Sequence, residues 1–401
     1  TATNSLNTAV GYVAGSSITT GTNNTLVGAN TGDALTIGVD NVSIGRSSLT
    51  TDVAGKFSVA IGSSALESQN FTTATNAYNV AVGHNAGKAV TTGIENTFVG
   101  ANCGDATDDG KENTAVGSHA LSGNCGNNNT AMGRFALVSA TGAGNTALGH
   151  QAGIALGSGS DNTFVGKSAG DGTSSGDENT AVGVSSLSAV AGNGNTTVGH
   201  ASLFLCTGAS NTAIGASAGS SLTSGGNCLF LGKDAGLSGS PGGVITTSSD
   251  SVRLGDENIT NCHIQVDWTV ASDQRDKTDF VDLDLGLDFV KALEPVTYYW
   301  DKRSKYGDKY ADDYDLNAQT PDGTHKEDWM DIGFKAQSVQ SLEEAAGYKA
   351  EDKKNLTVST SEDGKQMGLQ YSKFVPILVK AIQDQDAIIQ SLTARIAALE
   401  S

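Results

Sequence analysis

The sequence holds little of what fills a large core or breaks a β-ladder. Only 6% of its 401 residues are aromatic, and 4 Pro stand beside 51 Gly. Gly-rich disordered linkers usually carry Pro as well, whereas Pro removes a backbone donor and is excluded from stacked ladders. High Gly with almost no Pro therefore favours ordered, tightly turning β-structure.

Positive charge and long apolar runs are scarce too. The net charge of −19 argues against binding to nucleic acid or to an anionic membrane, because both need basic patches. No signal peptide and no run of 18 apolar residues is present, so we expect a soluble chain that is made in a cytoplasm and does not insert into a membrane.

Paired cysteines are missing as well. An odd number of cysteines without a CxxC pair indicates neither a zinc site nor a disulfide framework, so we expect buried, reduced thiols and no metal or cofactor. The five are Cys103, Cys125, Cys206, Cys228 and Cys262.

Residues 1–255 do contain a repeat, Asn-Thr-x-aliphatic-Gly, as in Asn7–Gly11 and Asn24–Gly28. Copies follow one another at 16 or 17 residues, with one step of 21 and a last one of 23. This period is too short for helical hairpins, and at about 3.3 Å per residue it makes one coil of two short strands and two turns. The alternation of Thr163 and Val165 on one face is typical of a strand. We predict a mainly β fold with a β-solenoid or β-roll shaft of about fifteen coils.

The corners of the repeat carry its polar residues. Gly after the strand permits positive φ, and recurrent Asn suits a stacked turn whose side-chain amides bond along the column. Acids precede the Asn at one corner, where calcium binding is one interpretation and solubility with protection of strand edges is the favoured one. These acids are Asp40, Glu95, Glu112, Asp161 and Glu178. The repeats resemble the β-roll heads of trimeric bacterial adhesins and the shafts of phage tail fibres, which implies a trimer.

A composition change follows at residues 256–277. Ile264, Val266, Trp268 and Val270 alternate, which predicts a terminal strand within 256–271 that runs into Ser272-Asp273-Gln274-Arg275-Asp276-Lys277. This motif resembles the opening of the endosialidase-type intramolecular chaperone found at the C-termini of phage tailspikes and tail fibres. By this resemblance the domain assists trimerisation and then cuts the Ala271–Ser272 bond, with Ser272 as nucleophile, Lys277 as general base, and Asp273 and Arg275 as supporting residues.

The chemistry of the pair is consistent with that role. A serine hydroxyl needs a neighbouring base, and a lysine serves only if its pKa falls from about 10.4 towards neutrality, which burial on assembly causes. Ser-Lys pairs are a known variant of the catalytic triad. The alternative is an ordinary surface Ser, with Lys277 in a salt bridge to Asp273 or Asp276.

Residues 272–401 are expected to form a smaller α+β chaperone domain. A helix over Leu285–Leu293, a strand over Val296–Trp300, and a polar loop at 301–330 that is a candidate projecting arm come first. Segments 331–339 and 369–383 resemble two further landmarks of the family, although Ser338 stands where the family has an acid. A heptad then spans about 375–400. Its a positions are Val375, Ile382, Ile389 and Ile396, and its d positions are Leu378, Gln385, Leu392 and Leu399. This pattern favours a parallel dimer, whereas the resemblance implies a trimer.

The sequence therefore predicts a homotrimeric phage tail fibre or spike protein of the virion, assembled in the host cytoplasm. Its expected partners are other tail proteins and a host cell-surface receptor, for which a polysaccharide is one candidate. It would be a single-turnover serine auto-endopeptidase without an external substrate. Two alternatives are a trimeric adhesin-like surface protein whose C-terminal module does not cleave, and a polysaccharide depolymerase in the β-region.

Overall fold

The computed structural model describes residues 5–265, 268–311, 313–352, 354 and 356–400. The chain divides into two compact units. The first comprises Thr1–Leu237 with Ile245–Gly255, and the second Ser238–Val244 with Asp256–Ser401. Within those described ranges, no helix combines the length and apolarity needed to cross a membrane.

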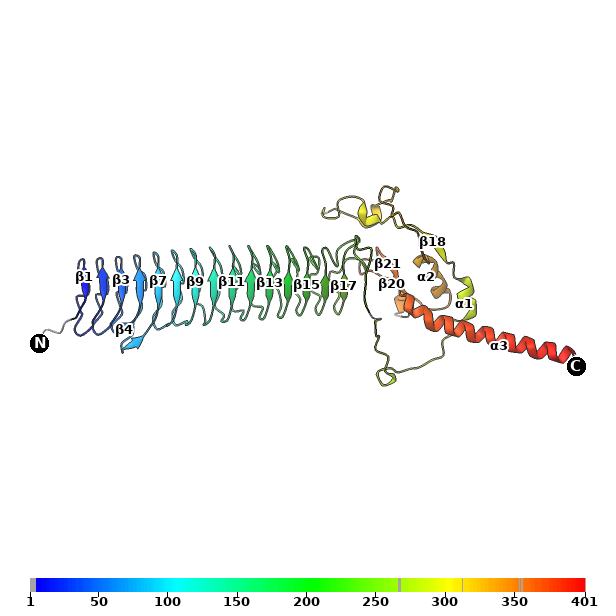
Figure 1. The fold of residues 1–401 in the computed structure, drawn as a ribbon, viewed down its shortest axis with the longest axis horizontal. Helices are drawn as coiled ribbons and strands as arrows, with labels where there is room; N and C mark the ends of the chain where they lie inside the picture. The colour runs from blue at the N-terminus through cyan, green and yellow to red at the C-terminus, as the bar shows by residue number, and fades with distance from the viewer. Residues whose placement is uncertain (1–4, 266–267, 312, 353, 355, 401) are drawn as a thin grey trace. The chain divides into compact units, whose positions relative to one another are not determined.

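The first unit is a β-solenoid whose strands stack into one parallel sheet (Figure 1). Fifteen strands form the sheet, which confirms the predicted solenoid, and fourteen complete turns lie between them. Neighbouring strands keep one register, so that Thr163 faces Thr180 and Val165 faces Val182. The strands are β1 (Thr8–Val10), β2 (Thr25–Val27), β3 (Val42–Ile44), β5 (Val59–Ile61), β7 (Val80–Val82), β8 (Thr97–Val99), β9 (Thr114–Val116), β10 (Thr130–Met132), β11 (Thr146–Leu148), β12 (Thr163–Val165), β13 (Thr180–Val182), β14 (Thr196–Val198), β15 (Thr212–Ile214), β16 (Leu229–Leu231) and β17 (Val252–Leu254).

The prediction of two strands per coil was wrong. Within the described residues, a second strand occurs only as the pair β4 (Gly55–Lys56) and β6 (Thr75–Asn76). Elsewhere left-handed residues interrupt the extended backbone: after β12, Ser168 has φ +54 and Gly170 φ +63. The rest of each coil is therefore a chain of turns rather than a strand.

The middle residue of each strand points into the solenoid. Phe98, Phe164 and Phe230 are fully buried at this position, and small Ala side chains occupy most other coils. The large rings fit because glycines leave room beside them: a Cβ on Gly170 would lie 2.5 Å from the ring of Phe164. The resulting core is one continuous column rather than a single globular centre.

A ladder of buried asparagines runs along the solenoid, as predicted. Asn162 donates from Nδ2 to Asn145 Oδ1 (3.0 Å) and to the Gly176 carbonyl (2.9 Å), and its own Oδ1 accepts from the Asn179 backbone N–H (2.9 Å). Each amide thus bonds to the coils on both sides. Fully buried members of the ladder are Asn24, Asn41, Asn79, Asn96, Asn113, Asn129, Asn145, Asn162, Asn179, Asn195 and Asn211.

The ladder is interrupted at Ser58 and repaired by a side chain from the long 21-residue step. Gln69 Nε2 donates to Ser58 Oγ (3.1 Å) and to Asp52 Oδ2 (2.8 Å), while its Oε1 accepts from Asn79 Nδ2 (2.9 Å). Asp52 is fully buried, and this burial raises the pKa of its carboxyl. The longer coil therefore supplies the amide that the repeat lacks.

The second unit is a small α+β structure, as predicted. Its helices are α1 (Leu287–Ala292), α2 (Ala336–Ala345) and α3 (Phe374–Glu400). Two antiparallel pairs join them, β18 (Val296–Tyr298) with β19 (Asp331–Gly333), and β20 (Val358–Thr360) with β21 (Met367–Leu369). The buried apolar residues of its core are Leu285, Phe289, Val339, Val358, Phe374 and Ile377.

The polar segment 301–330 is bound to its own unit rather than projecting freely. It contains the short 3-10 turns Arg303–Lys305 and Leu316–Ala318. Lys309 pairs with the buried Glu257 (2.7 Å), and Arg303 Nη2 donates to the Lys365 carbonyl (2.6 Å). These contacts tie the first part of the segment to residues 257 and 365 of the same unit.

The terminal strand expected within 256–271 is not formed in the described residues 256–265 and 268–271. Ile264 and Trp268 are exposed (51% and 74%). A strand forms only where a neighbouring strand satisfies its backbone, and the described residues offer this segment none. Residues 266 and 267 of the expected strand lie outside the described residues.

Candidate functional site

Ser272 and Lys277, five residues apart in sequence, meet in space. Lys277 Nζ donates to Ser272 Oγ at 2.6 Å. The two ends are brought together by a single 3-10 turn, Gln274–Asp276. Sequence reasoning paired these residues, and the turn gives the pairing a geometric cause.

Asp273 and Arg275 hold that turn in place. Asp273 is its N-cap and accepts from the Arg275 backbone N–H at 2.9 Å. The Arg275 guanidinium also makes a two-pronged ion pair with the same carboxylate, at 2.6 Å (Nη2–Oδ2) and 3.1 Å (Nε–Oδ1). This hydrogen-bonded guanidinium lowers the pKa of Asp273. Both residues support the turn and leave the hydroxyl of Ser272 to Lys277.

The alternative pairing of Lys277 with an acid does not occur in the described part of the chain. Asp273 pairs with Arg275, and no ion pair joins Lys277 to Asp273 or Asp276 within the described ranges. The ammonium hydrogens of Lys277 therefore point to the hydroxyl and to solvent.

Everything around this site is open to water. Every residue from 268 to 282 is exposed, including Ala271 on the other side of the predicted scissile bond. A single chain thus brings the serine and the lysine together without enclosing them. Enclosure favours the neutral form of an amine and strengthens any hydrogen bond to a developing oxyanion. The exposed pair therefore still needs surrounding protein that excludes water.

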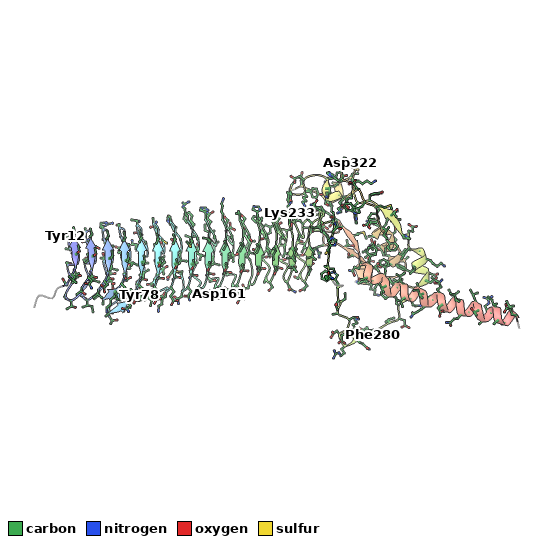
Figure 2. The ribbon with its side chains drawn as sticks, viewed as in Figure 1. Tyr12, Tyr78, Asp161, Lys233, Phe280 and Asp322 are labelled. Atoms are coloured by element: carbon green, nitrogen blue, oxygen red, sulfur yellow. The ribbon has the colours of Figure 1, made fainter. Side chains whose placement is uncertain are left out.

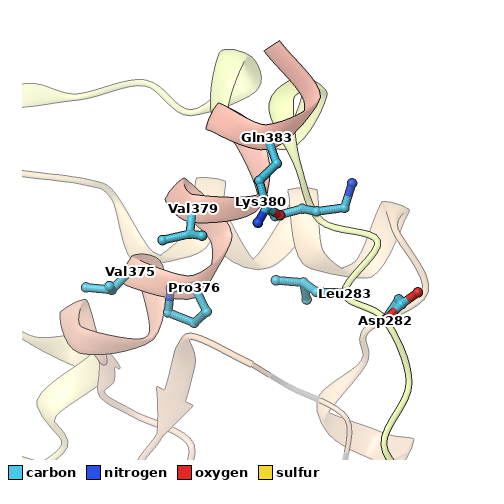
Figure 3. Close-up of a pocket in the computed structure, with 7 residues that line it drawn as sticks. All are labelled: Asp282, Leu283, Val375, Pro376, Val379, Lys380 and Gln383. Carbon is cyan, nitrogen blue, oxygen red and sulfur yellow. The ribbon is translucent and has the colours of Figure 1, made fainter. Parts of the chain in front are cut away.

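A pocket of about 580 Å³ lies between segment 282–283, which follows the Ser-Lys motif in sequence, and α3 (Figure 3). Val375, Pro376, Val379 and Leu283 form its apolar surface, and the polar groups at its edge come from Asp282, Lys380 and Gln383. None of the predicted catalytic residues lines it. With one carboxylate, this pocket lacks the pair of acids that glycoside hydrolysis uses.

The helix α3 has two faces with different surroundings. Phe374, Ile377 and Ala381 are buried in the unit's core, and Asp384 accepts from the Leu287 backbone N–H that opens α1 (3.1 Å). The heptad positions lie on the other side: exposed fractions are 59% for Val375, 65% for Ile382 and 53% for Ile389. An apolar stripe thus faces solvent in a single chain.

Two polar contacts of this unit were not predicted. Glu343 of α2 is buried and accepts from the Leu356 and Thr357 backbone N–H groups at 3.2 and 2.7 Å. Its position four residues after the buried Val339, on the inner helix face, was the available signal. Lys380 pairs with Asp384 at i, i+4, and this ion pair lowers the pKa of Asp384. Both contacts position helices rather than reacting groups.

The thiols and corner acids form no second site. Four cysteines are buried as expected, whereas Cys262 is exposed. Burial raises the pKa of Cys103 to about 12 and that of Cys206 to about 11, so these thiols stay protonated. Among the residues that the structure describes, no group of three or more His, Cys, Asp or Glu side chains is placed to hold a metal ion.

Comparison with known proteins agrees with the position of this site. A family model described as chaperone of endosialidase matches residues 272–348, starting at the serine itself. The match includes α1, β18, β19 and α2, while the third predicted landmark and α3 lie beyond it. No curated protein and no solved structure matches the chain. Residues 272–348 are therefore a chaperone-of-endosialidase domain, which follows the β-solenoid in the sequence after residues 256–271.

Proposed function

We propose that this chain is a structural, tail-fibre-like virion protein whose C-terminal chaperone drives trimerisation and is then released by cutting the Ala271–Ser272 bond. The observation that carries the proposal is the 2.6 Å contact between Lys277 Nζ and Ser272 Oγ at the first residue of the chaperone match. The shaft would connect other tail proteins to a receptor on the host surface.

Cleavage of the Ala271–Ser272 bond would proceed in two acyl-transfer steps. Lys277, as a neutral amine, accepts the Ser272 hydroxyl proton while Oγ attacks the Ala271 carbonyl carbon through a five-membered ring. The C–N bond breaks, the departing amine of Ser272 takes the proton, and Ala271 becomes an ester of Oγ. Water then hydrolyses the ester, leaving a carboxylate on Ala271 and restoring the Ser272 hydroxyl.

Assembly supplies what the single chain lacks. In the isolated chain Lys277 donates to Ser272, whereas the reaction needs the amine as acceptor. Enclosure by neighbouring chains removes water from the amine and favours its neutral form. Cleavage would therefore follow assembly rather than precede it, and each chain would cut once.

The exposed stripe of α3 supports the association of chains. Ile382, Ile389 and Ile396 at a positions, with Leu392 and Leu399 at d, leave over 40% of each side chain in water. In a coiled coil these positions become the buried seam. The seam explains why the chaperone precedes a long terminal helix, and a homotrimer is the assembly that the family resemblance favours over the dimer.

Denaturing gels of the wild type and of Ser272→Ala test the proposal. The wild type is expected to give fragments of 271 and 130 residues, while Ser272→Ala and Lys277→Ala stay whole. Thr278→Ala, an exposed hydroxyl one residue beyond the lysine, is the matched control and should cleave normally. An uncut wild type, or a Ser272→Ala chain that is still cut at this bond, contradicts the mechanism.

The two alternatives make different predictions in the same experiment. An adhesin-like surface protein with a non-cleaving module would form trimers but never yield fragments. A depolymerase would shorten capsular polysaccharide, and such activity in the Ser272→Ala chain would show that it does not depend on the Ser272 hydroxyl. The acids of the solenoid are scattered among its corners, and in the described residues no group of three or more His, Cys, Asp or Glu side chains is placed to hold a metal ion.

A further inference from the structure

The outer face of the strands carries an unbroken aliphatic column. The third residue of all fifteen strands is Val, Ile, Leu or Met, and it points away from the core because the middle residue points in. Their side chains remain partly or largely accessible, as in Met132 (43% exposed), Leu148 (49%) and Ile214 (46%). At about 4.8 Å per strand the column runs roughly 65 Å along the solenoid.

The residues that flank the strands differ in charge between the two strand ends. The residue two before each strand is acidic in six coils and basic in none; this acidic rim comprises Asp40, Glu95, Glu112, Asp161, Glu178 and Asp250. The residue two after each strand, from β1 to β16, is never acidic; this basic rim comprises Arg46, His84, Arg134, His150, Lys167, His200 and Lys233.

The two rims lie on opposite edges of the stack. Figure 2 places Tyr12 and Lys233, both in the row after the strands, along one edge, and Tyr78 and Asp161, both in the row before them, along the other. All of the charged rim residues are exposed. Four of the eight Lys and Arg residues in the first 271 positions belong to the basic rim, so this segregation is a strong bias in an acidic segment.

A strand face of this kind is unusual for a monomeric protein. Monomeric proteins rarely expose a contiguous apolar patch of more than a few hundred Å², and an apolar centre with charged borders is the anatomy of an interface. The geometry points to the strand face of the solenoid as a self-association surface for parallel copies of this chain. The aliphatic columns would meet at the centre, and the acidic rim of each copy would lie against the basic rim of the next.

The charge pattern selects the direction of packing. When copies are related by rotation about an axis along the solenoid, whether twofold or threefold, each junction joins the acidic edge of one face to the basic edge of its neighbour. Turning one copy end over end, face to face, would place acid on acid and base on base. Like charges across an interface suppress wrong partners, so the rims favour parallel assembly, as the terminal α3 helices also require.

This inference deepens the proposed function, since it assumes the same homo-oligomer, but it concerns the solenoid and not the chaperone. Its test is the accessibility of one column residue. In the full chain carrying Ser272→Ala and Cys262→Ser, Leu148→Cys should react with a maleimide about tenfold more slowly than Thr141→Cys, an exposed loop position, because interface cores exclude solvent.

Charge reversal tests the rims in the same labelling assay. Reversing the acidic rim (Glu95, Glu112, Asp161 and Glu178 to Lys) should restore rapid labelling of Leu148→Cys at low salt, and so should reversing the basic rim (Arg46, Arg134 and Lys167 to Glu). Combining both sets should return the protection, because the signs are again complementary. Neutral Gln or Asn at the acidic positions controls for the left-handed backbone there, which Asn23 and Asn128 tolerate in other coils.

The outcomes separate the two proposals. If Leu148→Cys labels as fast as Thr141→Cys in a chain that still oligomerises and, with Ser272 present, still cleaves, the strand face is open and this inference fails while the proposed function stands. If the combined reversal is worse than either set alone, the rims do not pair. Loss of both cleavage and oligomers in the unmodified chain would contradict the proposed function instead.

Discussion

Buried side chains are distributed differently in the solenoid and in the C-terminal unit. The solenoid core runs without a break from Leu49 to Ile245, and every coil contacts only its neighbours. The C-terminal unit has six buried apolar residues at its centre and a 27-residue helix whose heptad positions face solvent. The stability of a repeat array is close to a sum of nearest-neighbour terms, whereas this helix exposes a large part of its apolar surface to solvent.

The largest expected effect comes from removing that surface. Replacing Ile382 and Ile389 by Asp should abolish both oligomers and cleavage, because each Ile contributes about 1.5–3 kcal/mol when fully buried. Sedimentation velocity and denaturing gels measure the two effects. Ala387→Asp, on the outer side of the heptad, should leave both unchanged. A monomeric double variant that still cuts itself would show that assembly does not control the cut.

Core deletion in the solenoid is expected to be next in size. Phe164→Ala removes a fully buried ring and should cost about 3–5 kcal/mol of unfolding free energy. Urea unfolding followed by far-UV circular dichroism reports on both units, and the transition that Trp fluorescence does not show belongs to the solenoid. All three Trp residues, Trp268, Trp300 and Trp329, lie after it, so the fluorescence transition should stay where it is. A shift of both transitions together would mean that the units unfold as one.

The asparagine ladder offers a smaller test within the same coil. Asn162→Ala should cost about 1–3 kcal/mol, because it leaves the Asn179 backbone N–H and the Gly176 carbonyl buried without their partner. Asn162→Ser should cost less, because a hydroxyl can still make one of these hydrogen bonds. Equal effects of Ala and Ser on the circular dichroism midpoint would argue against a contribution of the hydrogen bonds.

Lowering the pH should change the stability of the two units in opposite directions, and this is the smallest of the expected effects. Burial raises the pKa of Asp52 above its unfolded value, so the folded solenoid binds that proton more tightly and gains stability as the pH falls towards about 4. Hydrogen bonds from Lys365 and Lys380 lower the pKa values of Asp315 and Asp384. These two carboxylates therefore stabilise the folded unit at pH values above their unfolded pKa. That stability is lost as the pH falls through their folded pKa.

The two probes resolve this difference in one chain. Between neutral pH and about pH 4, the urea midpoint from circular dichroism should fall less in the wild type than in Asp52→Asn, while the Trp midpoint should not differ between the two. If Asp52→Asn leaves the pH dependence of the first transition unchanged, the buried carboxyl does not contribute to it.

Much of this structure was predictable because it is periodic. Asn and Gly at fixed spacing imply a ladder and a corner, and both are present from Asn24 to Asn211. The contact of Ser272 with Lys277 followed from the motif, because five residues are bridged by one turn. The catalytic roles of the two residues stay predictions.

Features that depend on distant contacts were not predictable in the same way. The alternation of Ile264, Val266 and Trp268 has the strand period, yet no strand forms in the described residues there, because periodicity does not supply a hydrogen-bonding neighbour. Gln69 repairs the ladder from an irregular step, which no repeat position predicts. The number of strands per coil depends on residues with positive φ, such as Ser168. The sequence alone does not predict positive φ at a serine.

Because the register of the strands is fixed, the length of the solenoid is set by its number of coils. Every coil adds one strand spacing of about 4.8 Å, and the longer step that carries β6 leaves the pairing of β5 with β7 unchanged. Duplication or loss of one repeat in the gene would therefore change the reach of the protein by a fixed increment, without altering the strands before it or the chaperone after it.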